Sequence, residues 1–243
     1  MIGFLGADVL YEQQFDPERD FLVSGVDETA SVIRESSLAI TPYSSRQRRS
    51  FASFSAYDSE ERLDGVGLLL GDCSADFQMP VIYIGGSIAV PYMTSTVAGA
   101  YDAGMLPAER TVWYIGARDF SADECAWARY NQRLMADGEI DIETAVKTAL
   151  SELAGTPCRV MLNIDIIDPV WAPYVRHQAG FGYDPKTLLK ALLCFEGGAV
   201  SMVQVCGLGN SGTDQEKNIT SRLAAELARE LSLAVFPFKL IKA

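Results

Sequence analysis

The chain has 243 residues, of which 49% are hydrophobic, and its formal net charge is -12. This length and apolar content suffice for one α/β domain with a large core, so we expect a single domain over residues 1–243. No basic cluster stands out beyond the segment from Arg46 to Arg49, which we expect to be a solvated loop. An acidic chain of this kind offers little to replace the counterions of phosphate, which argues against nucleic-acid binding.

The cysteines and the N-terminus indicate the compartment. Five cysteines are an odd number, they show no C-x-x-C spacing, and most stand in apolar surroundings typical of free buried thiols. The N-terminal segment MIGFLGADVLYEQQFD has no basic region, and no stretch approaches the roughly 18 apolar residues of a membrane helix. We therefore expect a cytoplasmic protein in a reducing environment, without membrane association.

Apolar runs and turn residues predict alternating strands and helices. Strands are predicted at residues 1–7, 65–70, 80–84, 111–115, 160–167 and 201–205. Helices are predicted at residues 25–36, 94–106, 121–134, 142–153, 185–195 and 219–228, with a loop at 46–61 and a further strand or edge cover at 233–240.

Three helix starts carry recognisable caps. Ser121 and Glu124 form an S-x-x-E capping box. Asp141 is a good N-cap for the helix that Gly155 ends. Asp184 followed by Pro185 combines an N-cap with a proline at the first helical position.

The stretch from Val160 to Pro173, VMLNIDIIDPVWAP, organises the chain. It predicts a buried parallel strand with Asn163, Asp165 and Asp168 at its C-terminal end. Ligands bind at this end of the strands in open α/β sheets. Asp168 precedes a proline, and we expect its carboxylate to accept backbone N–H groups just beyond the strand, in a structural role.

This stretch resembles the signature of the arginase/agmatinase (ureohydrolase) family, S-x-D-x-D-x-x-D-P-x-x-A-P, whose first two aspartates bind a pair of manganese ions. In the matching register Asp165 stands at the second metal aspartate and Asn163 at the first, while Met161 replaces the serine. The resemblance implies a three-layer α/β/α fold with a mainly parallel central sheet, here with one strand of the family pattern missing.

Further segments are similar to the family and depart from it at the same kind of position. Gly85-Gly86-Ser87-Ile88 resembles G-G-D-H-S, with Ser87 for the aspartate and Ile88 for the metal-binding histidine. No D-A-H-x-D motif is found, so either that strand is deleted or residues 80–87 are its remnant and the G-G-D-H-S strand is lost. Cys206 stands where the family has a glutamate, and Asp72-Cys73 is interpreted as a structural turn.

The segment TVWYI-Gly116-Ala117-Arg118-Asp119 matches the family's v-x-i-G-x-R-D strand end. Arg118 either faces the pocket or pairs with an acid on its rim. In the pocket it would neutralise Asp165, a role that Arg176 could also fill.

The family activates water with two manganese ions, which need roughly four carboxylates and two imidazoles. The chain contains a single histidine, His177, which excludes the family's two-histidine site. A zinc site of Cys206, His177 and Asp165, or a thiol couple of Cys206 and His177, is conceivable, but no spacing enforces either arrangement.

These residues predict a ureohydrolase-like pseudoenzyme without a cofactor. It would serve as a scaffold, as a partner or regulatory subunit of an active family member, or as a binder of a small ligand. The vestigial pocket would comprise Gly85, Gly86, Ser87, Ile88, Arg118, Asn163, Asp165, Asp168, His177 and Cys206. The alternative is a hydrolase of C–N bonds in guanidino or amidino compounds with a remodelled metal or cysteine site. Homo-oligomerisation is implied by the resemblance alone.

Overall fold

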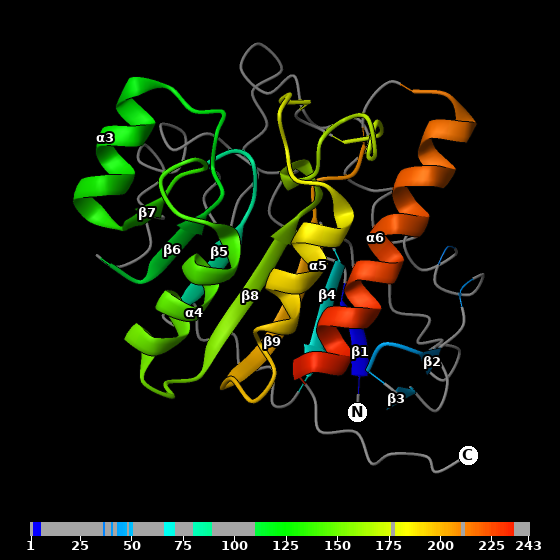
Figure 1. Ribbon diagram of the computed structural model, residues 1–243, viewed down its shortest axis with the longest axis horizontal. Helices are drawn as coiled ribbons and strands as arrows, with labels where there is room; N and C mark the ends of the chain where they lie inside the picture. The colour runs from blue at the N-terminus through cyan, green and yellow to red at the C-terminus, as the bar shows by residue number, and fades with distance from the viewer. Residues whose placement is uncertain are drawn as a thin grey trace.

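The computed structural model describes residues 2–5, 36, 40, 43–47, 49–50, 66–70, 80–88, 110–175, 178–209 and 212–235 (Figure 1). Within them a seven-stranded sheet has the order β1-β4-β9-β8-β5-β6-β7. Its strands are β1 (Ile2–Leu5), β4 (Val66–Leu70), β5 (Val81–Ile84), β6 (Val112–Ile115), β7 (Arg133–Met135), β8 (Cys158–Asn163) and β9 (Val200–Cys206).

The strands from β9 to β7 in that order are parallel to their neighbours. β4 pairs antiparallel with both β9 and β1. The predicted mainly parallel α/β sheet is therefore confirmed, and its parallel part carries the site, because the C-terminal ends of β5, β6, β8 and β9 meet at one edge.

Four helices accompany the sheet in the described residues: α3 (Ala122–Asn131), α4 (Ile142–Leu153), α5 (Pro185–Leu193) and α6 (Asp214–Val235). In Figure 1, α4, α5 and α6 lie side by side across one face of the sheet. The three predicted caps are present: Ser121 and Glu124 form the capping box, and Asp141 and Asp184 accept from the first turns of α4 and α5. Local side-chain chemistry thus sets where these helices begin.

Alternation along the strands sorts the core into two clusters. Ile82 and Ile84 of β5 pack with the helices α4, α5 and α6, whereas Val81 and Tyr83 point to the other face. Successive side chains of a strand point to opposite faces, which explains the division. Tyr83, Tyr114 and Met161 belong to this second cluster, to which α3 adds Ala128.

The predicted end of one helix was wrong. The helix predicted to reach residue 134 ends at Asn131, and Leu134 belongs to β7. Gln132 adopts an extended conformation, and its side chain accepts from the N–H groups of Thr111 and Val112 at 3.0 and 2.9 Å. This tertiary contact outweighs helix propensity and allows β7 to pair with β6.

The central strand also differs from its prediction. β8 ends at Asn163, and residues 164–166 form a one-turn 3-10 helix, η1 (Ile164–Ile166). The Asn163 side chain caps this turn by accepting from the N–H of Asp165 at 3.1 Å. Asp165 therefore lies on a turn beyond the strand.

The remaining differences lie near the termini. Residues 46–61 were predicted as loop, but β2 (Tyr43–Ser44) and β3 (Arg49–Ser50) form a small antiparallel ladder. Residues 233–235 are the last residues of α6 rather than a strand. The predicted helix at 94–106, the segment Asp72-Cys73 and the pair Arg176 and His177 lie outside the described residues, as do residues 236–240 and all but Ser36 of the helix predicted at 25–36.

The end of α6 holds the β2–β3 ladder through a buried carboxylate. Glu230 is 4% exposed and accepts from Ser44 Oγ at 2.7 Å and from Gln47 Nε2 at 2.9 Å. Arg229 adds an ion pair at 2.7 Å. Burial alone would raise the pKa of Glu230, but the hydrogen bonds from Gln47, Ser44 and Arg229 outweigh it and lower the pKa.

None of the described helices combines the length and the apolar character that a membrane crossing requires.

Candidate functional site

The candidate site lies where β5, β8 and β9 end. β5 and β8 are parallel neighbours, with Ile84 opposite Leu162, so the residues that follow them meet at the same edge. Asn163 stands opposite Cys206 at the ends of β8 and β9. The sheet thus brings together Gly85, Gly86, Ser87, Ile88, Asn163, Asp165 and Cys206.

Asp165 is the buried charge of this edge, with 1% of its surface exposed. Its Oδ1 accepts from the backbone N–H of Gly86 at 2.8 Å. Its Oδ2 accepts from the hydroxyl of Ser87 at 2.6 Å. Each carboxylate oxygen therefore has a donor from the turn after β5, which stabilises the ionised form in a buried place.

Asn163 joins the same network through a tyrosine. Its Nδ2 donates to the hydroxyl oxygen of Tyr83 at 2.7 Å, inside the second apolar cluster. Burial raises the pKa of Tyr83 well above its usual value, and the electrostatic influence of the neighbouring Asp165 and Cys206 raises it further. Tyr83 is thus a neutral phenol, and it is a site residue that the sequence analysis missed.

Arg118 binds main chain rather than a carboxylate. Its guanidinium donates to the carbonyls of Asp165 at 2.6 Å, Ile166 at 3.2 Å, Ala179 at 2.9 Å and Gly180 at 3.1 Å. The planar fork of arginine thus reaches the backbone of two loop segments, and neutralisation of Asp165 by Arg118 or Arg176 stays a prediction. Arg118 is a positioning residue for the chain after β8.

Asp168 has the structural role predicted for it. Its Oδ1 accepts from the N–H of Val170 at 2.9 Å and its Oδ2 from the N–H of Gly182 at 3.1 Å. One carboxylate thereby joins the two ends of the loop between η1 and α5.

Two glycines permit the close approach of these groups. A Cβ on Gly86 would lie 2.5 Å from Nη1 of Arg118 and 2.6 Å from the carbonyl oxygen of Asp165. Gly207 has φ of +91°, and its Cβ would overlap Oδ1 of Asn163. Larger residues at either position would displace the network.

The other predicted residues pack around this network. Ile88 is 4% exposed and belongs to the apolar cluster of Tyr83, and Cys206 is half-buried against that cluster. His177 lies outside the described residues, so the zinc and thiol couples predicted with it stay predictions. In the described part of the chain, no three His, Cys, Asp or Glu side chains are grouped as metal ligands.

A cavity of about 320 Å³ lies away from this site. It is lined by the end of α4 and by the turn at residues 196–199, including Leu150, Gly155 and Glu196. These segments precede β8 and β9, at the opposite end of the strands from Asp165. None of the predicted site residues lines the cavity.

Comparison with known proteins identifies the family. A sequence profile of the arginase family matches residues 50–234, which is most of the chain. The chain therefore belongs to the arginase family, as its Asp-Pro stretch indicated.

Individual relatives are distant. An agmatinase of Halalkalibacterium halodurans is 28% identical over 92 residues, which are 38% of this chain and 31% of that protein. The match thus spans about a third of that relative's length.

Solved structures share the fold. The arginase of Bacillus subtilis has a TM-score of 0.51 at 18% identity, over 68% of this chain and 63% of that one. The proclavaminate amidino hydrolase of Streptomyces clavuligerus has a TM-score of 0.51 at 18% identity, over 65% and 55%. A "putative agmatinase" of Clostridium difficile reaches 0.63 at 12% identity, over 91% of this chain and 94% of that one. These likenesses establish an arginase-like fold.

Proposed function

We propose that this chain is a non-catalytic member of the arginase family, which holds no manganese pair and acts as a partner subunit or scaffold. The observation that carries the proposal is the carboxylate of Asp165, whose two oxygens accept from Gly86 and Ser87 of the same chain. A residue that the family resemblance assigns to metal binding serves here as a hydrogen-bond acceptor between two strand ends.

The side chains of this edge fit a dinuclear manganese centre poorly. Divalent manganese prefers carboxylate and imidazole ligands, and their negative charge offsets that of the ions. Asn163 is neutral, and its amide nitrogen donates to Tyr83, so it offers neither the charge nor a free orientation. Ile88 has no lone pair to give.

A protein that loses its metal ions is expected to lose the negative charge of the metal ligands as well. Carboxylates left without their ions would be buried, uncompensated charges, which are strongly destabilising. An asparagine keeps the shape and hydrogen bonding of an aspartate without its charge. Asp165, the carboxylate buried at this edge, has two donors of its own.

The first experiment measures metal content and turnover in protein purified without chelator. We expect substoichiometric manganese and zinc, and no release of urea or ammonia from arginine, agmatine or guanidinobutyrate. Stoichiometric metal together with turnover would refute the proposal.

A thermal titration with Mn²⁺ sharpens this test. A site filled at a hundred times its Kd would stabilise the fold by about 2.7 kcal/mol, which raises the Tm visibly. We expect no shift for the natural chain. Asn163→Asp is the matched variant, because it restores one carboxylate with little change of shape; a shift in the natural chain contradicts the proposal, whereas a shift confined to the variant supports it.

A second candidate function is a C–N hydrolase that uses Cys206. The thiol is half-buried at the end of β9, opposite Asn163, so it stands at the edge where family members do their chemistry. If turnover occurs without metal, alkylation of the thiol and Cys206→Ser should both abolish it. Turnover that survives both changes removes this candidate.

The partner role is tested by co-expression with an active arginase-family protein from the same source. One mixed complex on gel filtration supports a partner subunit, and two separate peaks count against it. A single peak at a multiple of the chain mass would instead establish the homo-oligomer that the family resemblance implies.

A further inference from the structure

The loop between η1 and α5 exposes three large apolar side chains. Phe181 is 94% exposed, Val170 is 77% exposed and Trp171 is 52% exposed. All three stand on the loop that follows β8 and η1, and we call them the apolar patch. Exposed apolar side chains that gather on one loop mark interaction sites more often than singly scattered ones do.

Two side chains fasten the two arms of this loop, at residues 168–170 and 179–182. Asp168 bonds the N–H groups of Val170 and Gly182, so the two arms that carry the patch lie against each other. Arg118 donates to the carbonyls of Ala179 and Gly180, immediately before Phe181. A surface fixed before binding loses little entropy when a partner docks.

Phe181 adopts a backbone conformation that a bulky residue avoids. Its φ is +60°, in the left-handed region, where a side chain other than glycine or asparagine costs about 1 kcal/mol. At 94% exposure the ring recovers almost none of this cost by burial within the chain. The backbone strain at Phe181 therefore has no compensating gain in the stability of the folded chain.

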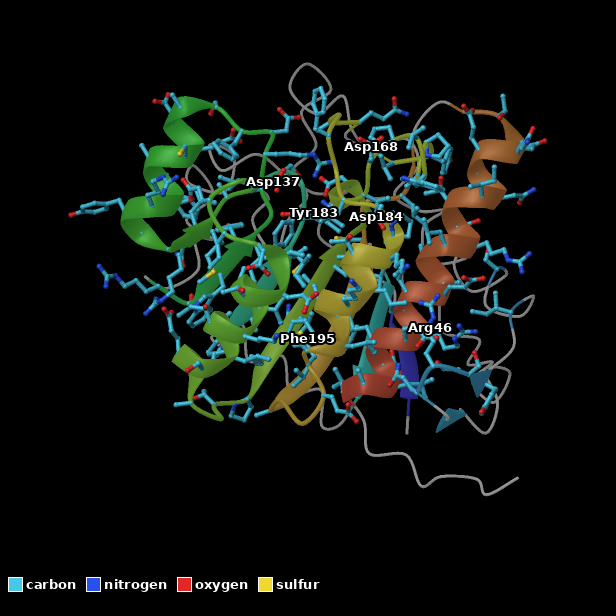
Figure 2. All side chains as sticks on the ribbon, in the orientation of Figure 1. Arg46, Asp137, Asp168, Tyr183, Asp184 and Phe195 are labelled. Carbon is cyan, nitrogen blue, oxygen red and sulfur yellow. The ribbon has the colours of Figure 1, made fainter. Side chains whose placement is uncertain are left out.

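Among the described residues, acidic side chains outnumber basic ones at this end of the sheet. Asp137, Asp168 and Asp184 come from three segments and lie at the same end of the molecule (Figure 2). The first turn of α6 begins at this edge as well, with Asp214 and Glu216. The described cations there are Arg118, bound to four carbonyls, and Lys186 and Lys217 of the first turns of α5 and α6.

The acidic side chains around the patch favour a partner of opposite charge. The whole chain carries a net charge of -12, so a second copy would be repelled at an acidic edge. A different protein with a positive rim would be attracted to it, and its apolar pocket would bury the aromatic rings of the patch. Buried Trp and Phe anchors inside a charged rim are typical of binding hot spots.

We propose that Val170, Trp171 and Phe181 form a docking surface for another protein, which presents a basic rim around an apolar pocket. The proposal rests on the non-catalytic partner role and names the surface that performs it. Its own test involves neither metal content nor turnover, so the two can fail separately.

The test places a photoreactive p-benzoyl-phenylalanine at position 181 of the full chain in the cells that produce it. The matched control carries the same group at position 130, since Tyr130 is 81% exposed on α3. Cross-linked proteins are identified by mass, produced in pure form, and measured for binding to the natural chain, to Phe181→Ser and to Trp171→Ser.

We expect one different protein to be captured from position 181 and not from position 130. Its affinity should fall at least about tenfold in Phe181→Ser and in Trp171→Ser, and should weaken as salt rises from about 50 to 300 mM. Capture no greater than at position 130, capture of a second copy of this chain, or binding indifferent to either variant or to salt would each overturn the proposal.

Discussion

The hydroxyl of Ser87 donates to Oδ2 of Asp165 across 2.6 Å, between the turn after β5 and the turn after β8. The two strands are parallel neighbours, and the turns that follow them are joined by this bond and by the bond from Gly86 N–H to Oδ1. A buried carboxylate that accepts a hydrogen bond on each oxygen connects the segments that follow the two strands.

Ser87→Ala should therefore destabilise the fold. The change removes the hydroxyl that donates to a buried ionised group, and such bonds contribute about 1.5 to 3 kcal/mol. Urea denaturation should show the free energy of unfolding reduced by about that amount. Ser151→Ala is the control, because Ser151 is exposed on α4; equal losses in both variants would show that the bond to Asp165 contributes nothing.

Gly207→Ala should be far more damaging than Gly197→Ala. Both glycines have left-handed φ angles, +91° and +77°, so both variants carry a backbone cost of about 1 kcal/mol. A Cβ at position 197 meets nothing within 4 Å, whereas one at 207 overlaps Oδ1 of Asn163. We expect Gly207→Ala to lose about 3 kcal/mol more in the free energy of unfolding by urea denaturation. Equal losses would show that Asn163 moves freely and that the network is loose.

Sequence reasoning worked where the determining contacts are local. Ser121, Asp141 and Asp184 cap their helices with donors two or three residues away, and such spacing is visible in the sequence. The Asp-Pro turn was predictable for the same reason, since Asp168 bonds the N–H of Val170. Short apolar runs likewise placed β5, β6 and β9.

The site itself depended on contacts between distant residues. Tyr83 and Asn163 are 80 positions apart, and Ser87 and Asp165 are 78 apart, so neither pairing has a local signature. Tyr83 looked like one more apolar residue of a buried strand. The charge of Arg118 suggested a carboxylate partner. The planar guanidinium can equally well donate to several backbone carbonyls, as it does to that of Asp165.

Acid should weaken the anchor at the end of α6. The pKa of Glu230 is lowered, so its stabilisation is complete above the unfolded-state pKa and is lost as the pH falls through the folded-state pKa. Glu230→Gln should therefore cost about 1 to 3 kcal/mol at pH 7 and less at low pH. Denaturation at a series of pH values measures this gap. Glu226→Gln, in an exposed pair with Arg222, is the control and should change little; a gap for Glu230→Gln that is constant with pH would contradict the prediction.

Phe181→Asn should stabilise the isolated chain, whereas Phe181→Ala should not. Asparagine tolerates the left-handed region because its short polar side chain bonds locally, but alanine keeps the steric conflict between Cβ and the carbonyl. Since Phe181 is 94% exposed, neither variant loses much buried apolar surface. Urea denaturation should show a gain of up to about 1 kcal/mol for the asparagine variant and almost none for alanine. A loss in both variants would mean that the ring stabilises the monomer, and the strain at this position would then need no partner to explain it.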